Sequence, residues 1–287
     1  MVSNSIGASP FDALICPLDG EPLQREAALW RCAQGHCFDI AKEGYVNLLP
    51  VQNKRSRDPG DSKEMIVARR RFLAASHYQS IANAVSATVL QTLGAQKSLA
   101  CLDAGCGEGY YLRELITAAS TQCHVSTIGV DISKWAVQSA AKQSSQSAWV
   151  VGSNANLPMQ SQSVDVVLCM FGFPVYPEFA RVLKPQGALV LVESGVDHLR
   201  ELREIIYPQV KVAAASEAPA IAGFELCDEH TVSSTIDLET QAQIADLLVM
   251  TPHLYRASAQ GREQAAKLTQ LSLTVEAKIS VLQRTAS

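Results

Sequence analysis

The sequence has no long hydrophobic run. No window approaches the roughly 20 consecutive apolar residues that a membrane-spanning helix needs, so we expect no membrane span. Residues 1–20 lack the basic start and continuous apolar core of a signal peptide, so we expect none. No internal repeat occurs, which excludes a repeat architecture. With 47% hydrophobic and 18% charged residues, the 287-residue chain has the composition of a folded protein, either one large domain or a small module joined to a domain of about 200 residues.

The chain also lacks an overall excess of positive charge, since its net charge is −4. The charge is unevenly distributed, however. Residues 42–71, the basic segment, contain eight basic and four acidic residues, a local charge of +4 that leaves −8 for the remainder. Such a segment can contact phosphates, and it can equally be the solvated face of a linker.

Cysteine, in contrast, is plentiful, with eight residues in the chain. Because we expect no export signal, we interpret these cysteines as reduced, and therefore as metal ligands or small core residues of a cytoplasmic protein. They stand at positions 16, 32, 37, 101, 106, 123, 169 and 227.

The first cysteines belong to a pattern that resembles a zinc knuckle. Cys16 and Asp19 have two residues between them, Cys32 and His36 have three, and twelve residues separate the two pairs. Asp19 stands where a second cysteine would make the pattern strong. Carboxylate is a legitimate zinc ligand, so the four residues could close a tetrahedral site, although one weaker than a site with more thiolates.

Two alternatives to this ligand set stay open. Cys37, beside His36, could replace a neighbouring ligand after a small backbone shift. The module could also be held by packing alone, with Trp30 and Phe38 as its core. Without a metal, a segment this small has little core to offset its chain entropy.

Beyond the knuckle the pattern changes twice. Residues 44–51 are strand-like, and the chain becomes helical from about Ser62, where the spacing of Asp61 and Glu64 predicts a capped helix start. From Leu99 onward, buried strands alternate with helices, which predicts an α/β fold with a doubly wound parallel sheet. We expect its strands within residues 98–105, 124–133, 148–154, 164–171 and 188–194, with further strands at 224–238 and 271–284.

The stretch "LACLDAGCGEGYYLREL" carries the first sign of a ligand site. A buried strand ends at Asp103, and Gly105, Gly107 and Gly109 follow before a helix begins. Glycines there let the backbone approach a ligand at the carboxyl edge of the sheet. A dinucleotide fingerprint needs its third glycine at position 110, which is Tyr110, so the spacing disfavours NAD.

Asp131 ends the second strand of this alternation. Its two carboxylate oxygens could accept hydrogen bonds from both hydroxyls of a ribose. It could also cap the helix that follows, and both roles can hold at once.

These motifs resemble those of class I S-adenosylmethionine-dependent methyltransferases. The resemblance covers about residues 99–192 and includes the glycine loop, the acid closing the second strand, "LPMQSQSVDVVLCMF" and "RVLKPQGALVLV". It implies a Rossmann-like sheet and S-adenosylmethionine as cofactor. By that resemblance the motif from Asp103 through Gly105, Gly107, Glu108 and Gly109 would bind the methionine end, Asp131 the ribose, and Ser153 and Asn154 the adenine.

The flanking segments narrow the family. The knuckle, "KEGYVNLLP", "KRSRDPGDS", "HYQS", "DHLRELREIIYPQV" and "VMTPHLYRAS" resemble the bacterial large-subunit (23S) rRNA guanine-N1 methyltransferases over nearly the whole chain. That family has cysteine where this chain has Asp19. The resemblance implies zinc, an rRNA hairpin as partner, a homodimer, and cofactor contacts from Tyr78 and His198. Phosphate contacts are then expected from Lys54, Arg55, Arg57, Arg69 and Arg70.

We therefore expect three parts in the chain. Residues 1–40 form a zinc-ribbon-like module, residues 41–80 a basic RNA-contacting segment and linker helix, and residues 81–287 the methyltransferase domain. An alternative is a methyltransferase for a small molecule, which would leave the knuckle and the basic segment without a role. A non-catalytic RNA-binding relic is a second alternative, against which the intact glycine loop argues.

To reach N1 of a guanine, such an enzyme must take the base from a loop or flip it out, which calls for surfaces on which the base can stack. Phe171, Phe173 and Tyr176 could provide them, or could be core residues. No carboxylate directly follows the fourth strand, and although Glu193, Asp197 and His198 follow the fifth, the sequence assigns no catalytic base.

Overall fold

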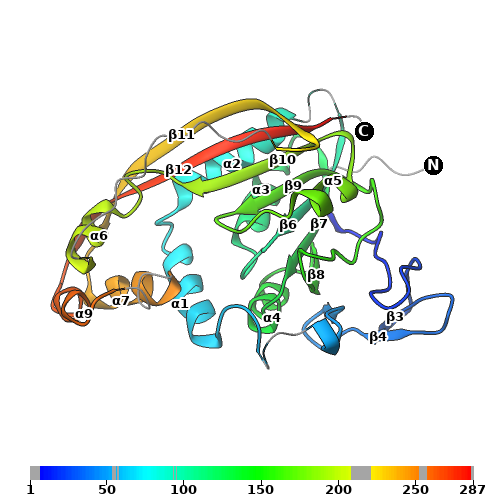
Figure 1. Ribbon diagram of the computed structural model, residues 1–287, viewed down its shortest axis with the longest axis horizontal. Helices are drawn as coiled ribbons and strands as arrows, with labels where there is room; N and C mark the ends of the chain where they lie inside the picture. The colour runs from blue at the N-terminus through cyan, green and yellow to red at the C-terminus, as the bar shows by residue number, and fades with distance from the viewer. Residues whose placement is uncertain are drawn as a thin grey trace.

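We describe the fold from a computed structural model, which covers residues 7–53, 56, 58–92, 94, 96–207, 221–251 and 257–285. Most of its strands form one large sheet with helices packed on it (Figure 1). The central strands are buried along nearly their whole length, as expected of parallel strands covered on both faces. The strands are β1 (Gly7–Pro10), β5 (Tyr45–Asn47), β6 (Ser98–Ala104), β7 (His124–Asp131), β8 (Ala148–Val151), β9 (Val164–Met170), β10 (Leu183–Ser194), β11 (Phe224–Leu238) and β12 (Leu271–Arg284).

The strand order of this sheet is β11-β12-β10-β9-β6-β7-β8-β5, and β1 also pairs with β7. The strands from β10 to β5 run parallel. The order reverses at β6, because the chain adds β7 and β8 on one side before it returns to add β9 and β10 on the other. In open α/β sheets, ligands bind at such a reversal, beyond the carboxyl ends of the strands. The predicted Rossmann-like methyltransferase sheet is confirmed.

At the other edge, β12 lies antiparallel to both β10 and β11. β11 and β12 extend past the central strands toward a group of helices that includes α6, α7 and α9 (Figure 1). The helices are α1 (Lys63–Ala74), α2 (Gln79–Thr92), α3 (Tyr110–Ala119), α4 (Lys134–Gln143), α5 (Tyr176–Val182), α6 (Arg200–Ile206), α7 (Gln241–Met250) and α9 (Ala259–Ala266), with a 3-10 turn at Val51–Asn53.

The start of α1 differs in detail from the prediction. Ser62, not Asp61, is the N-cap, and its side chain accepts a hydrogen bond from the Met65 amide at 3.2 Å. Asp61 is instead paired with Arg69. Among the described helices, none combines the length and the apolar character needed to cross a bilayer.

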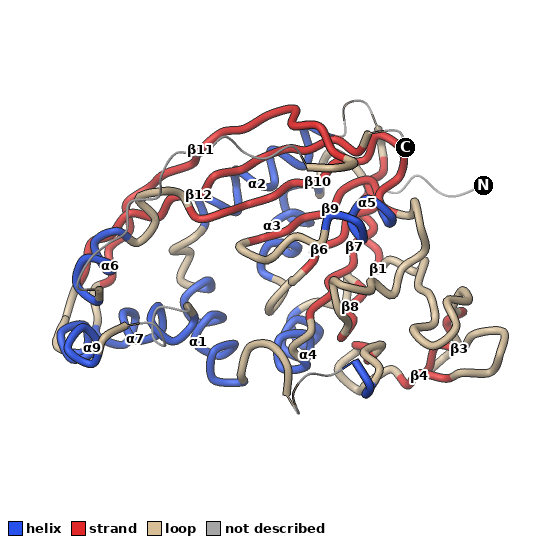
Figure 2. The backbone as a smooth tube through the Cα atoms, viewed as in Figure 1, coloured by secondary structure: helices blue, strands red, loops and turns tan. Residues whose placement is uncertain are grey.

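The N-terminal module contains a small antiparallel sheet of β2 (Gln24–Arg25), β3 (Leu29–Arg31) and β4 (Cys37–Asp39), set apart from the large sheet in Figure 2. The segments on either side of it join the large sheet, β1 beside β7 and β5 beside β8. Trp30 and Cys32 belong to the same hydrophobic cluster as Leu157 and Phe179. The module therefore shares its core with one face of the large sheet, so packing of Trp30 against Phe38 is not its only support.

Candidate active site and metal centre

The glycine loop begins where β6 ends, at the reversal of strand order. Gly105, Gly107 and Gly109 have φ values of 95°, 54° and 81°, in the left-handed region that side chains rarely adopt. A Cβ atom at Gly109 would lie 2.4 Å from the Trp149 ring, so glycine is required there twice over. The loop thereby brings backbone close to whatever lies beyond the carboxyl end of β6.

Asp103 is fully buried just before this loop, and neither carboxylate oxygen has a hydrogen-bond partner among the described residues. Burial, and then the negative charge of Asp131, raise the pKa of Asp103 to about 8. A buried carboxylate without a partner is costly, because its charge has lost its hydration. A cationic group at the glycine loop would stabilise the ionised form.

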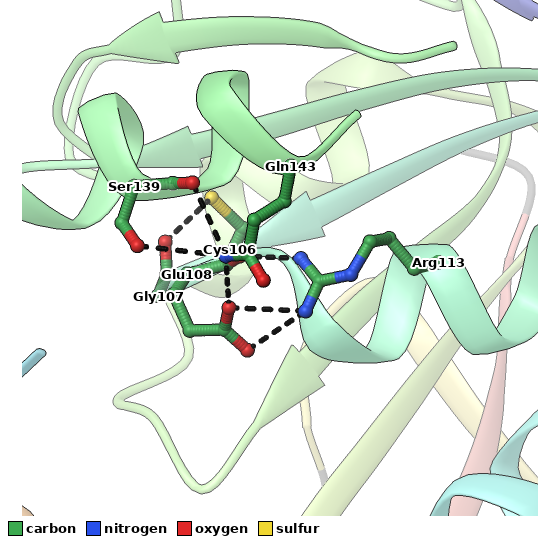
Figure 3. A network of polar contacts seen from close by, with 6 residues as sticks. All are labelled: Cys106, Gly107, Glu108, Arg113, Ser139 and Gln143. Atoms are coloured by element: carbon green, nitrogen blue, oxygen red, sulfur yellow. Dashed lines mark hydrogen bonds and ion pairs between the residues drawn. The ribbon is translucent and has the colours of Figure 1, made fainter. Parts of the chain in front are cut away.

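Glu108, expected at the cofactor, makes a network of contacts with neighbouring protein groups (Figure 3). Both of its carboxylate oxygens accept from Arg113 Nη2 at 3.0 Å, and Gln143 Nε2 of α4 donates to one of them. Arg113 Nη1 also donates to the Glu108 carbonyl at 2.6 Å. Glu108 is only 1% exposed, so this network fixes the loop to α3 and α4. Arg113 and Gln143 were not anticipated, since only the fold brings α4 to the loop.

Asp131 ends β7 and is tied to the same loop. Its Oδ2 accepts from the Gly107 amide at 2.9 Å and its Oδ1 from the Ser133 amide at 2.7 Å. Ser133, not Asp131, caps α4. Each carboxylate oxygen keeps a lone pair after these bonds, so Asp131 can still accept from two ribose hydroxyls. Burial raises the pKa of Asp131.

The two residues expected at the adenine follow β8. Asn154 Nδ2 lies 3.9 Å from the position that a Cβ on Gly105 would occupy, so this side chain borders the glycine loop. Ser153 Oγ accepts a hydrogen bond from the Ala155 amide at 3.2 Å and helps to shape the turn.

Tyr78 and His198, 120 positions apart in the sequence, meet in the structure. The Tyr78 hydroxyl lies 3.2 Å from His198 Nε2, and the Glu276 amide donates to His198 Nδ1 at 3.1 Å. Because Nδ1 accepts, the proton of a neutral His198 is on Nε2 and is donated to Tyr78. Phe171 stacks on His198 with ring centroids 5.8 Å apart.

The loop after β9 adds two aromatic side chains at this edge. Phe171 has φ 51°, a left-handed conformation that is an outlier for a bulky residue, and such strain clusters at functional sites. Phe173 is 90% exposed, so it is not a core residue. Tyr176, by contrast, begins α5 and packs against Phe224 with ring centroids 6.0 Å apart.

The four knuckle residues come together as expected. One ligand atom from each of Cys16, Asp19, Cys32 and His36 lies within 4.8 Å of the others. Asp19 Oδ2 is 2.8 Å from His36 Nδ1 and 3.2 Å from Cys32 Sγ. Two thiols, an imidazole and a carboxylate form a donor set that zinc accepts.

Asp19 is oriented for this role by the backbone. Its Oδ1 accepts from the Glu21 amide at 2.9 Å, which leaves Oδ2 facing the other ligands. This hydrogen bond, the largest contribution, lowers the pKa of Asp19 and keeps it ionised. Cys37 is exposed, and its Sγ donates to the Gly35 carbonyl at 3.3 Å. Asp19, rather than Cys37, therefore completes the cluster of side chains that could hold a metal ion.

The residues expected to contact phosphates fall into three groups. Lys54, Arg55 and Arg57 lie outside the described residues. Arg70 is exposed on α1. Arg69, its neighbour, is directed toward the glycine loop, with Nη1 3.5 Å from the position of a Cβ on Gly107.

Comparison with known proteins agrees with this geometry. Residues 14–57 match the zinc-ribbon family described as "RlmA, N-terminal", and residues 101–187 match the family described as "Methyltransferase domain". The fold, the glycine loop and the second match define the class: this is an S-adenosylmethionine-dependent methyltransferase.

Three relatives narrow the class. A protein of Micromonospora griseorubida assigned as a 23S rRNA (guanine-N(1)-)-methyltransferase is 37% identical over 206 residues, 66% of this chain and 68% of the relative. YxjB of Bacillus subtilis (strain 168), assigned likewise, is 28% identical over 94% of this chain and 97% of its own. The 23S rRNA (guanine(748)-N(1))-methyltransferase of Streptomyces fradiae is 32% identical over 66% of each chain. The chain belongs to the family of 23S rRNA guanine-N1-methyltransferases.

The residues present fit S-adenosylmethionine. Asp103 offers a buried, unpartnered carboxylate to a cationic ligand, and Asp131 offers two acceptors to a ribose. The glycine loop between them has no side chains at its three glycines, so the cofactor can lie close to the main chain there. The chain's second expected cofactor, zinc, fits the cluster of Cys16, Asp19, Cys32 and His36.

Proposed function

We propose that this protein transfers a methyl group from S-adenosylmethionine to N1 of a guanine in a hairpin of large-subunit rRNA. The observation that carries this proposal is the combination of three features in one chain. They are a zinc-ribbon module, a methyltransferase glycine loop, and the exposed side chain of Phe173 at the same carboxyl edge of the sheet as that loop. A methyltransferase for a small molecule would need neither the ribbon nor the exposed aromatic residue.

In the proposed reaction, the cofactor supplies a methyl group on a positively charged sulfur. The chain holds the cofactor through the glycine loop and Asp131, and it holds the base through Phe171 and Phe173, on which a flipped guanine can stack. The Tyr78 hydroxyl accepts from His198, which leaves its own proton free to be donated into the site.

Removal of the N1 proton is not assigned to His198. Both of its nitrogens are engaged, Nδ1 by the Glu276 amide and Nε2 by Tyr78, so neither has a lone pair for the guanine proton. His198 therefore positions Tyr78 and Phe171. Placing N1 in line with the methyl group supplies most of the rate gain in this proposal, because proximity and orientation alone can lower a barrier by several kcal/mol.

We also propose the assembly of the protein. The division into residues 1–40, 41–80 and 81–287 stands as our assignment of its parts, with the basic segment facing the rRNA. A homodimer is supported by β11, a 15-residue strand at the end of the sheet order, since long edge strands offer backbone donors and acceptors to a second chain. Because ribosomal RNA is the proposed substrate, we propose that the protein is located in the cytoplasm.

The test is methyl transfer from labelled S-adenosylmethionine to unmodified large-subunit rRNA, followed by primer extension. A methyl group on N1 blocks base pairing, so we expect label in the RNA and one new reverse-transcription stop at a guanine. Label without a stop would move the reaction to another atom or base. An enzyme that binds the cofactor but labels only small molecules would overturn the proposal in favour of the alternative substrate class.

A further inference from the structure

Arg69 is one residue of the basic segment whose side chain is directed to the interior of the site rather than outward. Its guanidinium is held on two sides, by an ion pair of Nη1 with Asp61 Oδ2 at 2.5 Å and by a hydrogen bond from Nη2 to the Met250 carbonyl at 3.1 Å. Its side chain is 25% exposed. Because one partner lies just before α1 and the other at the end of α7, the guanidinium is fixed by the fold.

The clamp places Arg69 at the glycine loop. Its Nη1 lies 3.5 Å from the position that a Cβ on Gly107 would occupy, an ordinary contact distance, so the guanidinium lies directly beside the loop. Asp61 is itself anchored, since Ser133 Oγ donates to its carbonyl at 2.7 Å. Arg69 thus borders the loop beside the residues that follow β7.

The positive charge of Arg69 lowers the pKa values of several groups in the site. Burial raises the pKa values of Tyr78 and Tyr111, and the positive charge of Arg69 opposes both rises. It likewise opposes the burial that raises the pKa of Asp131. Arg69 is therefore close to the aromatic side of the site and to the ribose-binding acid at once.

A guanidinium carries five N–H donors, and the partners described account for only part of them. At the same loop, Asp103 presents a buried carboxylate with no partner. A site with one fixed cation and one buried carboxyl that a nearby cation would ionise is complementary to a zwitterion, such as the amino-acid part of an S-adenosyl ligand. The ammonium group would suit Asp103, and the carboxylate would suit Arg69.

We propose that Arg69 is a cofactor-binding residue that pairs with the carboxylate of the methionine part of S-adenosylmethionine, and that it does not contact RNA. This inference rests on the proposed methyltransferase function, whose cofactor it uses, but not on the identity of the methyl acceptor. It also separates Arg69 from Arg70, which the sequence alone treated alike.

The test compares two ligands that differ in the amino-acid part. S-adenosylhomocysteine has the carboxylate, and 5′-methylthioadenosine lacks it. Their affinities for the full chain are measured by calorimetry with wild type, Arg69→Ala, Arg69→Lys and the control Lys267→Ala, which removes an exposed cation just after α9. Melting temperatures confirm that each variant is folded. If Arg69→Ala does not fold, the comparison uses Arg69→Lys, which keeps the charge.

We expect Arg69→Ala to weaken S-adenosylhomocysteine binding about tenfold or more, the usual effect of losing a charge-assisted hydrogen bond, and to leave 5′-methylthioadenosine within about twofold. Arg69→Lys should lie between wild type and Arg69→Ala, and Lys267→Ala should match wild type. Equal loss for both ligands, or no loss for either, would overturn the inference.

A gel-shift assay with an unmodified rRNA hairpin separates the RNA role. Weaker RNA binding by Arg69→Ala, with both adenosine ligands bound as in wild type, would return Arg69 to the phosphate contacts and overturn the inference. If wild type shows the expected ligand pattern but labels no RNA, the inference holds and the proposed acceptor fails. If wild type binds neither ligand, both fail.

Discussion

At the scale of single residues, the site contains ionisable groups whose burial the fold does not fully compensate. Asp103 is the clearest case, since its pKa is raised to about 8 by burial and by Asp131. In the unfolded chain its pKa is about 3.9. Between these values the unfolded carboxyl has lost its proton and the folded one has not, so this residue destabilises the fold increasingly as the pH rises from about 4 to about 8.

Asp103→Asn should therefore stabilise the ligand-free protein, and the gain should grow by about 1.4 kcal/mol per pH unit through that window before it levels off. The measurement is the free energy of unfolding in urea for both proteins at several pH values. A gain that does not change with pH would show that Asp103 does not titrate in this range.

Phe173 is proposed to stack on the flipped base because its side chain is exposed. Phe173→Ala should leave the melting temperature unchanged, because the side chain is 90% exposed. It should lower kcat/KM for rRNA about tenfold or more, because stacking of one base on an aromatic ring contributes about 1–3 kcal/mol. Lys267→Ala is the control, since Lys267 is exposed and lies outside the site, and it should leave kcat/KM unchanged.

At the scale of elements, the glycine loop is held by α3 and α4 through Glu108. The carboxylate is buried and paired with Arg113, so Arg113→Ala leaves a buried charge with one amide donor. We expect a loss of about 3 kcal/mol in the free energy of unfolding. Arg200→Ala, which breaks only exposed ion pairs, should cost less than about 1 kcal/mol. Equal losses in the two variants would mean that the buried network contributes no more than a surface pair.

The element scale also shows what the sequence could predict. Strands β6 and β7, which carry Asp103 and Asp131, were predicted well, because buried runs bounded by glycine or a helix start are local signals. The partners of β1 and β5 could not be predicted, since strands of four and three residues carry no usable periodicity. The direction of Arg69 was equally hidden, because it depends on Asp61 not capping α1 and on α7, far along the chain.

At the scale of the whole molecule, the zinc-ribbon module and the large sheet share one hydrophobic cluster. Asp19→Cys should raise zinc affinity, because thiolate is the softer donor, and should raise the melting temperature. Cys37→Ser should change neither, since Cys37 is directed to the Gly35 carbonyl. Metal content after dialysis against a chelator, with thermal unfolding alongside, measures both. Zinc lost equally from wild type and Asp19→Cys would show that position 19 is not a ligand.

The chain leaves the large sheet after β1 and returns to it at β5, with the ribbon between the two. A bridge between Leu14 and Met159 fixes the outgoing segment as well. The ribbon is thus fastened to the sheet at both of its ends and cannot swing as an independent arm. In the proposed reaction, the distance between the ribbon, which holds the RNA, and the cofactor, which supplies the methyl group, is then constant. The choice of guanine would therefore be decided by the RNA, through the number of nucleotides that bridge this span.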